Sequence, residues 1–177
     1  MTTIKIEIRD QDVLTALDRL AAGTRNPAPV LKAIGEDLTR QVKRTFETGA
    51  DPWGRPWAAN KASTLAGFIG TFGASSFKKN GGLNKKGAVR LASKRPLIGE
   101  TRQLSTQISY HVAGGVLTVG SSMEYAAMQQ FGGTRVKFPN LWGDIPARPF
   151  LPVTASGELS PDAQRTVVET IREFLLG

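Results

Sequence analysis

Residues 121–151, SSMEYAAMQQFGGTRVKFPNLWGDIPARPFL, pass from a short helical pattern through a double glycine to a proline-rich end. Ser122 is suited to cap a helix, and Tyr125, Met128 and Phe131 then recur at a spacing that places them on one helical face. The double glycine is expected to end the helix, because glycine accepts the left-handed backbone of a C-terminal cap at little cost. This region therefore predicts one short helix followed by an irregular loop.

The proline-rich end, residues 145–151 (IPARPFL), is expected to form a stiff extended strap. Each proline fixes its own φ and pushes the residue before it into an extended conformation. Arg148 should then point out of the strap. The loop before the strap carries Phe138 and Trp142, and this much apolar surface in an irregular segment needs cover from its own domain or from a neighbour.

Two interpretations of this region stay open. Apolar residues at helical spacing are more often core than interface, and the prolines would then only route the chain back over the sheet. In the other interpretation the helix, the loop and the strap form a subunit or partner interface, with contacts from Tyr125, Phe131, Phe138, Trp142, Arg148 and Phe150.

Residues 4–49 predict a strand and two helices. Isoleucines alternate with charged residues over positions 4–8, which is the period-two signature of a half-buried strand. An amphipathic helix is expected over residues 10–23. Asn26 and the proline after it indicate a new helix start, and apolar residues then recur every three or four positions up to Gly49. This last helix should be the longest in the protein.

The remaining elements complete an α+β fold. A short helix should begin near Glu100 or Thr101 with Leu104 facing inward, and two alternating runs at 108–112 and 116–119 flank a glycine pair that signals a hairpin. A final helix should start at Ser160. Its apolar stripe would consist of Val167, Val168, Ile171, Phe174 and Leu175. We expect one domain over residues 1–177: a small, mostly antiparallel sheet packed against the long helix, with a long Gly/Lys-rich loop and a C-terminal helix.

Residues 51–57, DPWGRPW, are dense in turn formers and yet carry Trp53 and Trp57. Tryptophans in a loop usually cover the edge of a core or meet a partner. Both alternatives remain open here, packing within the chain or a subunit contact that includes Arg55.

The net charge of +8 is concentrated in one segment. No acidic residue occurs between Gly67 and Gly99, and about residues 67–95 we expect a long mobile basic loop. Such a loop can be merely solvated, can neutralise DNA phosphates without reading sequence, or can dock on an acidic surface of another protein. The contact residues would be Lys78, Lys79, Lys85, Lys86, Arg90, Lys94 and Arg95.

Four segments in a fixed order resemble the phage virion morphogenesis family of tail completion proteins from Mu-like and P2-like tailed phages. They are RTFETGADPWGRPWAANKASTLA from Arg44, LIGETRQLSTQISY from Leu97, EYAAMQQFGG from Glu124 and IPARPFL from Ile145. A more distant similarity links them to neck and tail-component proteins of siphophages. The chain departs from the family pattern at Arg102, where glycine is expected, and in its Gly/Lys-rich segment.

The sequence offers little for catalysis, cofactors or membranes. Without cysteine there are no disulfides, thiolate nucleophiles or Cys-bound metals. No apolar run approaches a membrane span, and the N-terminus lacks the apolar core of a signal peptide. His111, the single histidine, is expected to be an ordinary strand residue, because no nucleophile or orienting carboxylate accompanies it in a recognisable motif. We therefore expect no enzyme, no cofactor and no metal.

The resemblance implies a structural assembly protein that completes the tail or joins head and tail. It would form a ring around the DNA channel, a hexamer at family level, and dock on head-connector and tail-terminator or tail-tube proteins. It would reside in the virion neck or the head-proximal end of the tail after assembly in the bacterial cytoplasm. The alternative is a non-specific nucleic-acid-binding protein that uses the basic loop.

Overall fold

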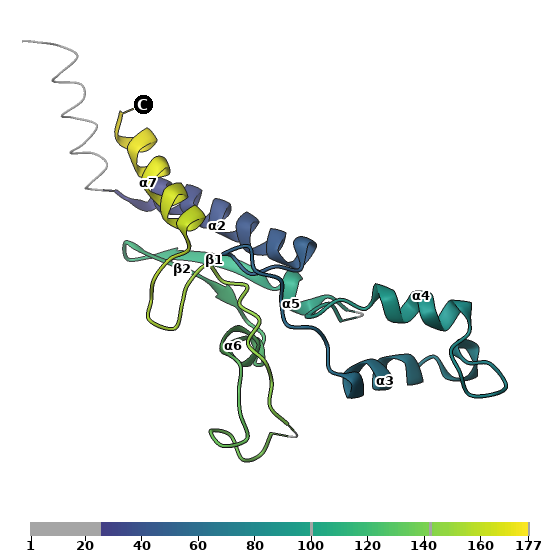
Figure 1. The fold of residues 1–177 in the computed structure, drawn as a ribbon. Helices are drawn as coiled ribbons and strands as arrows, with labels where there is room; N and C mark the ends of the chain where they lie inside the picture. Colours follow the sequence, from purple (N-terminus) through teal and green to yellow (C-terminus); the bar gives the residue numbers. More distant parts are fainter. Residues whose placement is uncertain (1–25, 100, 142, 177) are drawn as a thin grey trace, which may run out of the picture.

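The computed structural model describes residues 26–99, 101–141 and 143–176 (Figure 1). A long helix, α2 (Ala28–Thr48), lies across a hairpin of β1 (Ile108–Ala113) and β2 (Val116–Ser121), and the last helix, α7 (Pro161–Leu176), packs alongside α2. Helices combined with an antiparallel sheet confirm the α+β class. The strand expected at 4–8 and the helix expected at 10–23 fall outside the described residues.

Helix α2 forms where its apolar stripe predicts it. Pro27 occupies the N-cap, and the Asn26 side chain accepts a hydrogen bond from the Ala28 amide at 3.3 Å. The helix ends at Gly49, whose left-handed backbone (φ +72°) lets its amide donate to the Thr45 carbonyl. Its buried apolar side chains are Val30, Ile34, Leu38, Val42 and Phe46.

These side chains divide into two packing clusters along α2. The first half of the helix contacts Ala163 of α7 together with Leu117 and Val119 of the hairpin. The second half, around Phe46, packs against the residues that follow α2 and against the strap. Its buried members are Val42, Phe46, Trp57, Leu104, Ile108, Ala126 and Phe150. One helix therefore holds both halves of the body together.

The hairpin has the predicted two-residue turn. Ala113 pairs with Val116, and the two glycines between them both have positive φ, +57° and +76°, as a type I′ turn requires. The hairpin comes very close to α2 at Gly35, where an added Cβ would lie 2.5 Å from the Tyr110 ring. A small residue is thus needed where the helix crosses the sheet.

Two short helices follow the expected order, with different ends. Helix α5 (Gln103–Thr106) buries Leu104, as predicted. Helix α6 (Ala126–Phe131) has Tyr125 at its N-cap, so the expectation that Ser122 caps it is wrong. The Ser122 hydroxyl instead donates to the Gln107 side chain at 3.3 Å. Gly132 ends α6 with φ +73° but an extended ψ of 175°, because the chain turns directly toward the strap.

The expected irregular loop at 67–95 is wrong, because most of this segment is helical. Helix α3 (Ala62–Gly70), a 3-10 turn (Gly73–Ser76) and α4 (Lys85–Ser93) form a projection from the body, which we call the arm (residues 62–95; Figure 1). Asn84 caps α4 by accepting from the Gly87 amide at 2.9 Å, and its amide side chain donates to the Ser75 and Phe77 carbonyls. One capping residue thus ties both halves of the arm together.

Helix α7 begins after Ser160, as predicted. The Ser160 side chain is 1% exposed and accepts from the Ala163 amide at 3.4 Å. Its expected apolar stripe is only partly covered in the chain, since Val168, Ile171 and Phe174 are exposed. No helix within the described ranges is both long enough and apolar enough to cross a membrane.

Candidate interaction surface

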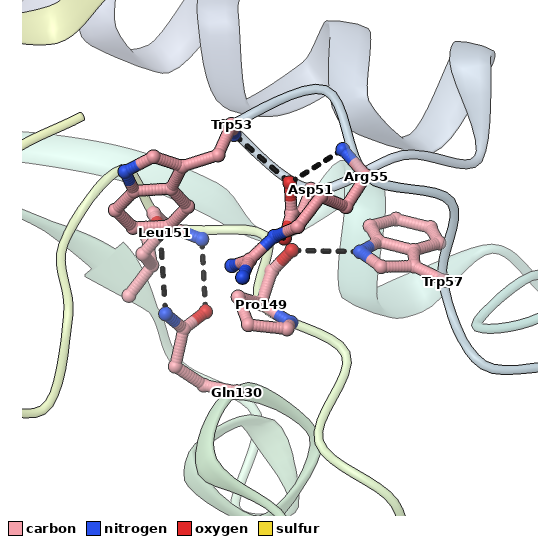
Figure 2. A network of polar contacts seen from close by, with 7 residues as sticks. All are labelled: Asp51, Trp53, Arg55, Trp57, Gln130, Pro149 and Leu151. Carbon is pink, nitrogen blue, oxygen red and sulfur yellow. Dashed lines mark hydrogen bonds and ion pairs between the residues drawn. The ribbon is translucent and has the colours of Figure 1, made fainter. Parts of the chain in front are cut away.

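The strap, residues 145–151, is held inside the molecule by side chains that bind its backbone and by its own arginine. The indole nitrogen of Trp57 donates to the Pro149 carbonyl at 2.7 Å (Figure 2). The Arg148 guanidinium turns back to donate to the Ala58 and Ala59 carbonyls at 2.8 and 3.0 Å. The prolines prevent the strap from pairing as a regular strand, and these contacts take the place of the backbone hydrogen bonds that a strand partner would supply.

Gln130 of α6 binds the end of the strap with both ends of its amide. Its Oε1 accepts from the Phe150 and Leu151 amides at 2.8 and 2.9 Å, and its Nε2 donates to the Leu151 and Val153 carbonyls at 3.3 and 3.2 Å. Figure 2 shows the pair of contacts to Leu151 side by side, as in a sheet. The side chain is 2% exposed. The sequence reasoning missed Gln130, which lies one helical turn after the buried Ala126 and on the opposite face from Tyr125 and Phe131.

Three residues expected at an interface are instead buried within the chain. Phe150 is fully buried against Phe46, with ring centroids 5.5 Å apart, and Trp57 packs edge-on to the same ring at 5.4 Å. Arg148 is 8% exposed and does not point out of the strap as expected. An extended segment projects alternate side chains to opposite sides, and here the inner side faces the core. These three residues therefore stabilise the monomer.

The turn at 51–57 is organised by Asp51, which is 7% exposed. One carboxylate oxygen accepts from the Trp53 and Arg55 amides at 2.9 Å each, and the other binds the Arg55 side chain at 2.8 Å (Figure 2). The guanidinium of Arg55 lies over the Trp53 ring, 5.7 Å from its centroid. Trp53 is half-buried and Arg55 is exposed, so both remain candidates for a subunit contact.

Exposed apolar side chains gather on α6 and the loop after it. We call this set the α6 surface; its members, with their exposed fractions, are Tyr125 (43%), Phe131 (53%), Val136 (93%) and Phe138 (44%). Tyr125 and Phe131 are thus not core residues. Val136, between two basic residues in an irregular loop, was missed by sequence reasoning. Trp142 lies outside the described residues. In Figure 1 this loop hangs away from the body.

The seven cations of the basic segment divide into two groups. Three have contacts within the described chain: Arg90 donates to the Ser75 and Ser76 hydroxyls, and Lys94 and Arg95 donate to backbone carbonyls. The other four are exposed near the tip of the arm and donate no side-chain hydrogen bond to any described residue. They are Lys78, Lys79, Lys85 and Lys86, which we call the tip lysines.

The hairpin carries two titratable side chains, Tyr110 and His111. The Tyr110 pKa is raised by desolvation and by the hydrogen bond of its hydroxyl to the Glu36 carboxylate at 3.1 Å. His111 is an exposed residue of β1 paired with Thr118. Across the described residues, no group of three or more His, Cys, Asp or Glu side chains is placed to hold a metal ion.

Comparison with known proteins agrees with the resemblance read from the sequence. No solved structure matches the chain. It is 28% identical over 172 residues to "Mu-like prophage FluMu G protein 2" of Haemophilus influenzae, an alignment that covers 97% of this chain and 95% of that protein. The model of the phage virion morphogenesis family matches residues 8–175. The chain therefore belongs to the phage virion morphogenesis family, a family of structural proteins in phage assembly.

Proposed function

We propose that this protein completes the tail or joins head and tail in a tailed phage, by docking to other virion proteins without catalytic turnover. Membership of the family over residues 8–175 supports the assembly role. The observation that carries the docking mechanism is the α6 surface, because a monomer that exposes several large apolar side chains in one region needs a partner to cover them. The protein is then a component of the neck or of the head-proximal end of the tail.

A ring around the DNA channel suits this role. Cyclic symmetry requires a head-to-tail contact in which one surface meets a different surface on the next copy. The α6 surface is the best candidate for one side of this contact, and the turn with Trp53 and Arg55 is a second exposed region available for the other. Six copies are the family-level expectation. The head connector and the tail terminator or tail tube would be the neighbours above and below, and assembly would take place in the bacterial cytoplasm.

Non-specific binding of nucleic acid is the second candidate function, and the tip lysines favour it. They carry four positive charges on an arm segment that contains no acidic residue. Cations of this kind neutralise phosphates and release counterions without reading sequence. In a neck, the arm would face packaged DNA in the channel.

The deciding experiment is electron microscopy of a lysate from the encoding phage with a stop codon in this gene, complemented with wild-type or variant protein. DNA-filled heads apart from tails are expected without complementation. Replacing Tyr125, Phe131 and Phe138 together with serine should give the same defect, whereas Val116→Thr, at a valine that is 61% exposed on β2, should restore particles. Normal infectious particles without the protein would refute the assembly role.

Binding of the purified protein to a short duplex tests the second candidate. If the tip lysines contact phosphates, log affinity should fall with log salt by about 0.9 for each phosphate contacted. Replacing all four with glutamine should reduce that slope. Binding by the isolated protein together with normal particles in the stop-codon lysate would favour the nucleic-acid function over assembly.

A further inference from the structure

A pocket of about 260 Å³ opens where the arm joins the body. Its walls come from parts of the chain that are distant in sequence: both ends of the arm, the segment before α5, α6 and the strap. The lining residues that matter here are Thr64, Lys94, Arg95, Tyr125, Gln129 and Arg148. We call it the arm-base pocket.

Arg148 brings a buried positive charge to this pocket. The side chain is 8% exposed, and burial lowers its pKa. Two of its five N–H donors are satisfied by the carbonyls of Ala58 and Ala59. Within the described ranges no carboxylate lies at ion-pair distance from it. Carbonyl oxygens satisfy donors but carry no net charge, so among the described residues this guanidinium has no counter-ion of the kind a buried charge usually has.

Lys94 and Arg95 bring two more positive charges to the arm-base pocket. The Lys94 ammonium donates to the Ile98 carbonyl at 2.7 Å, and Arg95 donates to the Glu47 carbonyl at 3.0 Å. Both partners are again backbone oxygens. Three cations therefore line one pocket whose described lining contains no acidic residue. Such a concave, positively charged site attracts an anion.

Gln129 supplies a second, independent observation at the arm-base pocket. Its side-chain oxygen is buried and accepts no hydrogen bond from any described residue. Buried acceptors are nearly always paired, so an N–H from a ligand is expected at this position. The occupant would thus combine a negative charge with an N–H donor, as an acidic residue in a polypeptide does.

The size of the pocket favours a side chain over other anions. Ligand pockets for small molecules typically hold about 300–1,000 Å³, and this one is below that range. Tyr125, at the rim, is 43% exposed and belongs to the α6 surface, which links the pocket to the proposed docking region.

We propose that the arm-base pocket binds the carboxylate of an acidic side chain from a neighbouring protein chain. Arg148 is its main contact, Lys94 and Arg95 add attraction, and the backbone of the same segment donates to Gln129. Only the identity of the neighbour as a virion protein rests on the proposed function. Residues of both the arm and the body line the pocket, so the bound carboxylate contacts both parts at once.

The first test is an NMR titration of the purified full-length protein with sodium acetate, against sodium chloride at equal ionic strength. The side-chain signals of Arg148 and Gln129 should shift saturably with acetate, with Kd of roughly 5–100 mM for one charge-assisted contact. The double variant Lys94→Gln/Arg95→Gln should weaken binding at least about threefold. The matched variant Lys85→Gln/Lys86→Gln, at the distant tip, should not. Equal shifts with chloride, or no saturation, would overturn the proposal.

Two further measurements distinguish the possible sources of the anion. If acetate binds only to the Glu100→Gln variant, the carboxylate belongs to this chain itself and the proposal is wrong. If a short DNA duplex shifts the Arg148 and Gln129 signals at lower concentration than acetate does, the site is for phosphate and the proposal is also wrong. These measurements need no phage particle, so their failure leaves the stop-codon experiment, and the assembly role, unaffected.

Discussion

Replacing Gln130 with methionine tests whether the strap depends on a side chain rather than on sheet pairing. The substitution keeps the length and the helix propensity of the residue, and removes only its amide. Two short hydrogen bonds to the Phe150 and Leu151 amides are lost, at 2.8 and 2.9 Å, along with two longer ones to carbonyls. The Phe150 amide is buried and the other backbone groups are half-buried, so little water can replace the lost side-chain amide.

The magnitude follows from the two short bonds. Leaving a buried donor unsatisfied costs about 1–3 kcal/mol, so the two amides together cost about 2–6 kcal/mol. Better burial of methionine offsets about 1 kcal/mol of this, by the worth of one or two buried methylene groups. We expect the free energy of unfolding to fall by about 1–5 kcal/mol, a large share of the roughly 5–15 kcal/mol typical of a domain.

Urea unfolding, followed by tryptophan fluorescence, measures this change. With a slope of about 2 kcal/mol/M, the urea midpoint should fall by roughly 0.5–2.5 M and the slope should be unchanged. Gln164→Met, at an exposed position of α7, is the control and should stay within about 0.5 kcal/mol of wild type. A Gln130→Met protein within 1 kcal/mol of wild type would show that the strap holds its place without this amide.

Three other changes test the packing, the arm and the hairpin. Gly35→Ala should destabilise the protein by about 1–3 kcal/mol, because its Cβ would lie 2.5 Å from the Tyr110 ring. The control Gly67→Ala has open space around it and should stabilise the protein by about 0.5–1 kcal/mol. If thermal unfolding showed both variants to be stabilised, or both destabilised, this account of the helix crossing would be contradicted. Lys85→Glu places a negative charge in the first turn of α4, where it interacts favourably with the helix dipole. The opening free energy of the α4 amides, measured by hydrogen exchange, should rise by about 0.3–1 kcal/mol. Faster exchange in the variant would contradict this prediction. Desolvation and the hydrogen bond to Glu36 raise the Tyr110 pKa in the folded state. The stability that Tyr110 contributes to the folded protein is therefore fully present below about pH 10, the pKa of the unfolded state, and is lost as the pH rises through the folded-state pKa. The stability difference between wild type and Tyr110→Phe should therefore be constant below pH 9 and shrink above pH 10 in urea titrations at several pH values, and a constant difference up to pH 11 would exclude the effect.

Local signals predicted the elements that local physics determines. The apolar stripe of α2 and its stop at Gly49, the glycine pair of the hairpin, and the start of α7 at Ser160 all appear where the sequence places them. Each depends on the conformational preference of one or two residues, or on a period that holds over several turns. Such preferences are visible without knowledge of the tertiary fold.

The arm was missed because its order comes from contacts across the segment. Neither helix of the arm has a long apolar period, and lysines and glycines dominate the composition. Contacts between the two halves of the arm include cation–π pairs: the Arg90 guanidinium lies 4.2 Å from the Phe72 ring centroid, and the Lys94 ammonium lies 4.7 Å from that of Phe68. Only Asn84 carried a local signal, as a helix cap before a lysine pair.

The direction of the strap could not be read from its prolines. They correctly indicate an extended backbone, but which side of an extended segment faces the core depends on what lies beside it. Here Trp57 and Gln130, distant in sequence, bind the strap so that Arg148 and Phe150 turn inward. The same tertiary contacts leave Tyr125 and Phe131 outside.

The arm leaves and rejoins the body at nearly the same place. The side-chain amide of Asn60 reaches the Lys94 carbonyl at 3.5 Å, so the two ends of the excursion lie together. A chain segment whose ends already meet can change in length at little entropic cost to the rest of the molecule. The arm can therefore gain, lose or exchange residues, including its charged ones, while the sequence of the body stays the same.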